Sequence, residues 1–259
     1  MAGARGPAAQ RAGDALCGGG ARAGLAPAGG RGLAGAAPWP GALAHGLRLA
    51  PALAGPGPVR LRRWLALGLF ETLLRRVARL RRRAAGRKSE PRLAVIDTQA
   101  VACIPVRGRR GYDAAKKVLG RKRVALVDAD GTWLAVAVVP ANVQDRDCLD
   151  ALTPGKQAWP SLREAVLDGA FVAERCEVWC NLHGMRRRVV ERDPARKGFV
   201  VLERRWVVER SFGWLVHWGG LLRDRAGRLD VSVARVAFAA VLSGVEALIN
   251  PMPIQAAAS

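Results

Sequence analysis

Two apolar runs joined by a tight turn constrain the fold of this chain more than any other feature. The runs occupy 123–128 and 133–139, and Asp130-Gly131 lies between them. Asp-Gly between two apolar runs is a strong β-hairpin signal, because both residues tolerate the positive φ of a type I′ turn. Further strands are predicted at 93–97, before the hairpin, and at 164–168, after it. The core must therefore be built at least partly on a sheet.

Helices are predicted around these strands. Apolar periodicity indicates a helix at 60–83, and further helices are predicted at about 142–152, 172–183, 204–222 and 231–249, with strand-like runs at 187–191 and 199–202. This order predicts an α/β fold with a mixed sheet flanked by helices, although order alone permits several such folds. Arg235, Ser243 and Glu246 interrupt the apolar run at 231–249. We therefore expect a buried core helix there and no membrane span.

The composition changes abruptly near residue 58. Residues 1–58 contain 15 of the 30 Gly, one acid (Asp14), and no Val, Ile or Lys. Such a segment cannot offset its ordering entropy, so we predict disordered low-complexity chain at 1–58. Its bias is typical of a GC-rich gene read in a shifted frame, and a natural DNA-binding arm is the alternative. The rest divides into a basic amphipathic helix and linker at 59–90, a main domain at 91–250 and a tail at 251–259.

The charge balance predicts a polyanionic partner. Lys and Arg number 42 against 21 Asp and Glu, for a formal net charge of +21. Such an excess favours nucleic acid first and an anionic membrane surface second, although a GC-rich genome also inflates Arg content. One face of the predicted helix at 60–83 is basic, and it is either solvated or in contact with DNA. Its residues are Arg62, Arg63, Arg75, Arg76, Arg79, Arg82 and Arg83.

Cysteine usage favours neither a disulfide framework nor a zinc site. The chain has five Cys, an odd number, and is long enough to fold without cross-links. Cys176, Cys180 and His183 fall on one predicted helix, but a second ligand pair at zinc-finger spacing is missing, so we predict no zinc. The N-terminus lacks the continuous apolar region of a signal peptide, and we expect a cytoplasmic protein.

Two aspartates lie at the ends of predicted strands. Asp97 and Asp168 each end an apolar run, and carboxylates at strand ends in one sheet can converge at one edge. A strand-end Asp is usually a turn or cap residue, yet converging carboxylates are also what a hard cation such as Mg²⁺ requires. Glu209, on the helix predicted at 204–222, is the best candidate for a third acid. Three close carboxylates would repel one another without a cation, which favours a metal site.

Five segments, in a fixed order, carry a family resemblance. V-I-D-T-Q-A-V at 95–101 resembles V-I-D-S-Q-S-V, and the run at 110–123 looks like G-Y-D-A-x-K-K-V-x-G-R-K-R-H. The run P-A-N-V-Q-D-R-D at 140–147 is similar to the next signature. L-D-G-A-F at 167–171 resembles A-D-G-G-Y, and 204–215 is similar to R-R-W-V-V-E-R-T-F-A-W-L. These are motifs of the DDE transposases of bacterial insertion sequences, which the chain resembles.

The resemblance implies a ribonuclease-H-like fold and a catalytic triad. By the matching motifs, Asp97, Asp168 and Glu209 would be the catalytic residues and bind two Mg²⁺ ions, with Mn²⁺ as a substitute. The implied reaction is DNA strand cleavage by water, followed by attack of the freed 3′-hydroxyl on target DNA. Its partners would be element-end and target DNA, with no membrane, and pairing of two ends suggests at least a homodimer. A nuclease without strand transfer, or a non-catalytic DNA-binding remnant, is the alternative.

Several basic residues near the expected metal site are candidate phosphate contacts, which would be independent of DNA sequence. Arg205 lies four residues before Glu209 and can share its helical face, although an ordinary ion pair is an equal alternative. Ala170 replaces the usual Gly of the second motif, and we expect Ala to resist a backbone conformation that Gly permits. The predicted DNA-binding residues are Lys116, Lys117, Arg121, Lys122, Arg123, Arg205 and Arg210.

Overall fold

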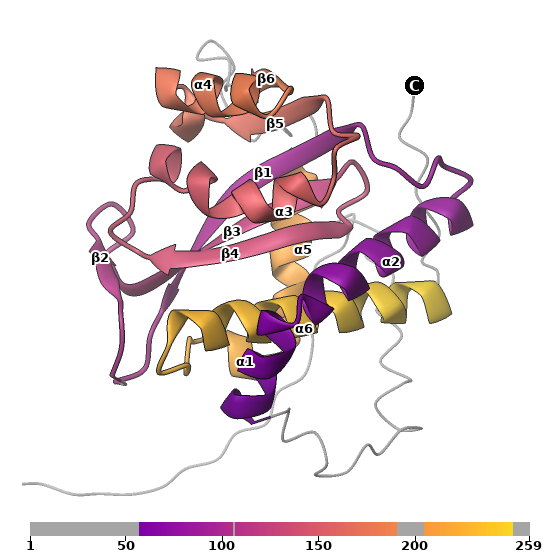
Figure 1. Ribbon diagram of the computed structural model, residues 1–259. Coiled ribbons are helices and arrows are strands. Elements are labelled where there is room, and N and C mark those ends of the chain that lie inside the picture. Colours follow the sequence, from indigo (N-terminus) through magenta and orange to yellow (C-terminus); the bar gives the residue numbers. More distant parts are fainter. Residues whose placement is uncertain (1–56, 106, 191–204, 251–259) are drawn as a thin grey trace, which may run out of the picture. The chain divides into compact units, whose positions relative to one another are not determined.

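The computed structural model describes residues 57–105, 107–190 and 205–250, all within the unit Pro51–Ser259 (Figure 1). The side chain of Arg205 is also outside the described part. Three predictions therefore fall on residues that are not described. They are the disordered segment at 1–58, apart from its last two residues, the strand-like run at 199–202, and the tail at 251–259.

One mixed sheet forms the centre of the domain. Strand β1 (Leu93–Ala102) pairs antiparallel with β3 (Val118–Asp128), which pairs antiparallel with β4 (Trp133–Pro140) and with the short β2 (Gly111–Asp113). On its other side β1 pairs parallel with β5 (Glu164–Asp168), and β5 pairs parallel with β6 (Arg186–Val190). The order β4-β3-β1-β5-β6, antiparallel and then parallel, is that of a ribonuclease-H-like sheet. The predicted fold class is confirmed.

The predicted hairpin joins β3 and β4. Gly131 has a φ of 80°, and the Asp128 carboxylate accepts hydrogen bonds from the backbone N–H groups of Asp130 and Thr132, both at 2.9 Å. Asp128 also forms a buried ion pair with Arg82, whose Nη1 lies 2.9 Å from Oδ2. The turn is thereby fixed to the helix that precedes the sheet.

Four helices share one hydrophobic core with one face of the sheet. They are α1 (Pro58–Ala66), α2 (Leu69–Ala84), α5 (Arg205–Val216) and α6 (Leu229–Ile249). Helix α2 runs alongside α6 (Figure 1). The single helix predicted at 60–83 is instead two helices, because Gly68 adopts a left-handed φ of 64° between them. Helix α6 is the one described helix long and apolar enough to cross a membrane, and here its buried side chains belong to this core.

The other face of the sheet carries α3 (Thr153–Gln157), α4 (Glu174–Leu182) and the short 3-10 helices at Asp145–Asp147, Leu149–Leu152 and Gly169–Phe171. The short helix predicted at 142–152 consists of the two 3-10 helices Asp145–Asp147 and Leu149–Leu152. Helix α5 ends at Val216, earlier than predicted, and a 3-10 turn at Gly219–Leu221 follows. Cys176 and Cys180 are buried in this second core, and the described residues contain no metal-ligand cluster there or elsewhere.

Candidate active site

Asp97 and Asp168 lie side by side on neighbouring parallel strands. Val95 on β1 is in register with Val166 on β5, so each aspartate lies two residues further along its strand. Side chains alternate between the two faces of a strand, which places both carboxylates on the face of Val95 and Val166. That face belongs to the core shared with α5. The convergence predicted for these two residues is therefore a feature of the structure.

A small cavity opens between the two strands and α5. Asp97 and Asp168 both line it, together with Val190 at the end of β6 and Val208 of α5. Both aspartates are half-buried. The strands and the helix thus hold two carboxylates at one partly shielded position.

Each aspartate is oriented by a backbone hydrogen bond. Asp97 Oδ1 accepts from the N–H of Thr98 at 2.7 Å, and Asp168 Oδ1 accepts from the N–H of Ala170 at 3.0 Å. Asp168 thereby caps the 3-10 helix Gly169–Phe171. Lys117 is the one described non-glycine residue with positive φ, so Ala170 does not need the glycine-like conformation that we expected it to resist.

Glu209 lies on α5 directly after the cavity-lining Val208. Its side chain is exposed, and it is not among the residues that line the cavity with Asp97 and Asp168. Within 57–105, 107–190 and 205–250, no three acidic, His or Cys side chains form a group able to hold a metal ion. The structure therefore brings two of the three predicted acids together and places the third on the adjacent helix.

A buried ionic network lies behind β1, on the face opposite Asp97. Thr98 Oγ1 donates to Asp145 Oδ1 at 2.7 Å, and Lys122 Nζ lies 2.9 Å from the same oxygen. Lys122 also donates to the carbonyl of Val143 at 2.7 Å and lies 3.8 Å from Asp113. Burial opposes ionisation of Asp145, but the hydrogen bonds from Lys122 and Thr98 outweigh it, so its pKa is lowered. Sequence reasoning missed this network, although its residues lie in or beside the quoted motifs.

The predicted DNA-binding residues separate into exposed and buried groups. Lys116 and Lys117 are exposed on the turn between β2 and β3. Arg121, Lys122 and Arg123 are buried, with 1%, 4% and 4% of their surface exposed. We therefore withdraw the prediction that these three residues contact phosphates, because their charges are directed at protein groups.

Arg121 and Arg123 hold the segment that follows α5. Arg121 Nη1 lies 3.1 Å from Asp224 and donates to the carbonyl of Ala226 at 2.8 Å. Arg123 donates to the carbonyl of Leu221 at 2.6 Å, and burial lowers its pKa to about 10. Both guanidinium groups therefore have a structural role.

Arg210 is half-buried on α5. Its guanidinium lies over the rings of Trp206 and Trp214, at 4.5 and 5.1 Å from their centroids, and donates to the carbonyl of Asp130 at 2.9 Å. Burial is the main cause of its lowered pKa. These contacts favour a packing role over phosphate binding. The prediction for Arg205 concerns a side chain outside the described part.

The donor set at the cavity suits a hard divalent cation. Mg²⁺ is commonly held by one or two protein carboxylates, with water and substrate phosphate oxygens as its other ligands. Asp97 and Asp168 supply two carboxylates from adjacent strands, and the cavity they line is partly shielded. The residues present therefore fit such an ion.

The sequence and the structure were compared with known protein families, curated proteins and solved structures. A family model described as a transposase DDE domain matches residues 88–243, more than half of the chain and including Asp97, Asp168 and Glu209. Among solved structures, the catalytic core domain of BIV integrase matches with a TM-score of 0.34 and 14% identity, covering 56% of this chain and 82% of that one. No curated protein sequence matches the chain significantly.

Proposed function

Because this chain belongs to the transposase DDE domain family, we propose that it cuts DNA strands and transfers the freed 3′-ends to target DNA in a metal-dependent reaction. The single observation that carries the proposal is the placement of Asp97 and Asp168 on adjacent parallel strands, where both line one cavity under α5. Carboxylate oxygens from adjacent strands are ligands of the kind that a hard divalent cation takes, which supports a metal-binding role.

In this proposal Asp97, Asp168 and Glu209 hold divalent ions, with Mg²⁺ as the expected metal. Such ions supply Lewis-acid stabilisation of negative charge on phosphate oxygens. The chain's own contribution is to fix the ligands. The N–H groups of Thr98 and Ala170 hold one oxygen of each aspartate, and the paired strands set the spacing between them. Glu209 would complete the set from α5.

We also propose DNA as the partner, with element ends and target as its two substrates. Two ends must be joined in one event, so we expect at least a dimer on DNA. The cytoplasm remains the expected location. The family resemblance and the excess of basic residues support these expectations.

The test is cleavage and strand transfer by the full chain. Labelled duplexes made from the DNA that flanks its gene would be incubated with Mg²⁺, and products separated on denaturing gels. We expect Asp97→Asn, Asp168→Asn and Glu209→Gln each to lower cleavage at least 100-fold while duplex binding persists, since removing one group that stabilises transition-state charge typically lowers the rate by about 100- to 1000-fold.

The matched control is Asp147→Asn. Asp147 is half-exposed and its nearest described ion-pair partner is Arg175 at 3.7 Å, away from the cavity. It should keep nearly full activity. Near-normal cleavage by any of the three site variants would exclude that residue from the site. Cut products without joined products would identify a nuclease that lacks strand transfer.

A further inference from the structure

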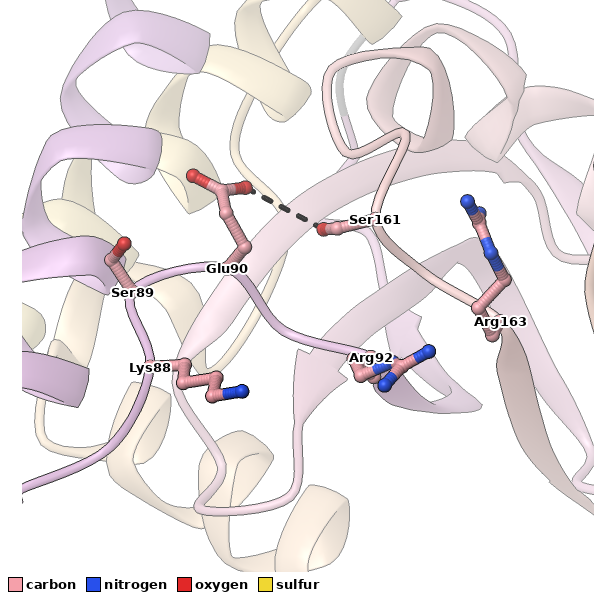
Figure 2. Close-up of a pocket in the computed structure, with 6 residues that line it drawn as sticks. All are labelled: Lys88, Ser89, Glu90, Arg92, Ser161 and Arg163. Atoms are coloured by element: carbon pink, nitrogen blue, oxygen red, sulfur yellow. Dashed lines mark hydrogen bonds between the residues drawn. The ribbon is translucent and has the colours of Figure 1, made fainter.

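A polar hollow lies at the start of strands β1 and β5. It is about 370 Å³ in volume, and its walls come from the linker after α2 and from the segment before β5 (Figure 2). The six lining residues include no apolar side chain. They are Lys88, Ser89, Glu90, Arg92, Ser161 and Arg163.

The two arginines are brought together by the parallel pairing of β1 and β5. Arg92 immediately precedes β1, and Arg163 immediately precedes β5. The backbone N–H of Arg163 donates to the carbonyl of Arg92 at 2.8 Å, which fixes the two residues side by side. Because the strands are parallel, both starts lie at one edge of the sheet, while Asp168 ends β5 at the opposite edge. The hollow is therefore separate from the carboxylate cavity.

The charge at this hollow is positive, and the described acidic side chains do not compensate it. Glu90 is the one acid that lines it, and Arg79 Nε already lies 2.6 Å from its carboxylate. Glu164, next to Arg163 in sequence, is paired with Arg188 at 3.0 Å and Arg186 at 3.5 Å. Among the described residues, no acidic side chain pairs with Lys88, Arg92 or Arg163.

These three cations are also available to a ligand. Lys88, Arg92 and Arg163 are all exposed, and Figure 2 shows the Arg92 and Arg163 side chains on the same side of the hollow. The described side-chain bonds of Arg163, to the carbonyls of Pro160 and Leu162, both leave from Nη1. Guanidinium groups bind phosphate oxygens through paired hydrogen bonds, and an ammonium adds a point charge.

We propose that Lys88, Arg92 and Arg163 form a second DNA-contact site, which binds backbone phosphates of duplex DNA at the sheet edge opposite the carboxylates. The ligand class, a phosphate group, follows from the uncompensated cations. Duplex DNA as its source rests on the proposed function. A membrane surface fits less well, since the lining offers no apolar side chain to insert into lipid. A buried small-anion site fits less well too, since all three cations are exposed.

The test is the salt dependence of duplex binding by the full chain. Fluorescence anisotropy would follow a labelled 30-base-pair duplex of arbitrary sequence, without Mg²⁺, over a range of NaCl concentrations. Each phosphate contact contributes roughly 0.9 to the slope of log affinity against log salt. The variant Lys88→Ala/Arg92→Ala/Arg163→Ala should therefore flatten the slope by about 2 to 3.

Matched variants separate local contacts from overall charge. Arg60→Ala/Arg223→Ala/Arg225→Ala also removes three exposed cations, and it should leave the slope nearly unchanged. Arg92→Lys/Arg163→Lys keeps the charges and should retain most of the slope. A circular dichroism melt shows whether the triple alanine variant folds; if it folds poorly, Lys88→Gln/Arg92→Gln/Arg163→Gln removes the same charges with less loss of side chain and should flatten the slope equally.

Two outcomes would overturn the proposal. Equal flattening in the triple variant and its control would show that only net charge matters. An unchanged duplex slope, together with loss of inorganic-phosphate binding measured by calorimetry, would identify a small-anion site instead. The binding assay needs neither Mg²⁺ nor cleavage. A negative binding result therefore does not contradict the proposed catalysis, and a negative cleavage result does not contradict the proposed phosphate site.

Discussion

The turn before β3 and the strand β3 itself both carry basic side chains, which are exposed on the turn and buried on the strand. Lys116 and Lys117 on the turn are exposed, whereas Arg121, Lys122 and Arg123 on the strand are buried. Burial of all three follows from the position of β3, because helices or loops cover both of its faces. Arg121 and Lys122 pair with carboxylates, and Arg123 donates to the carbonyl of Leu221. A run of basic residues therefore says little about DNA binding until the partners of each charge are known.

The largest expected effect comes from removing a buried cation. Lys122→Met leaves Asp145 without its closest cation and should destabilise the protein by about 3 kcal/mol, the typical cost of an unpaired buried charge. Lys116→Met, on the exposed turn, should change stability by less than about 0.5 kcal/mol. Urea unfolding followed by circular dichroism measures both. Equal stability of the two variants would contradict the structural role of Lys122.

A double variant sharpens this prediction. Adding Asp145→Asn to Lys122→Met removes the stranded charge, so the pair together should cost less than the sum of the two single changes. An additive result would mean that the two side chains do not interact, whatever the loss in each single variant.

The second prediction concerns the loss of stability at acidic pH that Asp145 should cause. The pKa of Asp145 is lowered in the folded state, so its contribution to stability is fully present above the unfolded value of about 3.9 and is lost as pH falls through the folded pKa. Asp145→Asn should therefore be less stable than the parent protein at pH 7, and the difference should shrink below about pH 4. Urea unfolding at a series of pH values checks it. A difference that stayed constant down to pH 2.5 would show that the charge of Asp145 is not the cause.

The sequence was sufficient for the features that depend on local pattern. The hairpin, the strands other than the short β2, and the shared position of Asp97 and Asp168 follow from apolar runs and from the residues that end them. The partners of Arg121 and Arg123 could not be predicted, because Ala226 and Leu221 lie 105 and 98 residues further along the chain. The break at Gly68 was missed because apolar periodicity continues across it. Glu209 was placed on the correct helix, but periodicity cannot say how far its carboxylate lies from the strands.

The third prediction concerns Lys116 and Lys117, the exposed lysines on the turn before β3. Lys116→Gln/Lys117→Gln should flatten the salt dependence of duplex binding by up to about 2, with no loss of stability, if both lysines contact phosphates. Arg223→Gln/Arg225→Gln removes the same charge from exposed positions elsewhere and serves as the control. Anisotropy titrations of a labelled duplex give both slopes. If the slopes of the two variants match, the turn is not a DNA contact.

The smallest expected effect lies at Lys117, which has a φ of 52° in the turn that leads into β3. A side chain with a Cβ is strained there by about 1 kcal/mol, whereas Gly is not, although Gly also increases the freedom of the unfolded chain. Lys117→Gly should therefore be more stable than Lys117→Ala by up to about 1 kcal/mol. Both variants lose the same charge, so their duplex-binding slopes should be equal. Urea unfolding and anisotropy on this one pair thus separate backbone strain from phosphate contact, and an Ala variant at least as stable as the Gly variant would show that the turn is not strained.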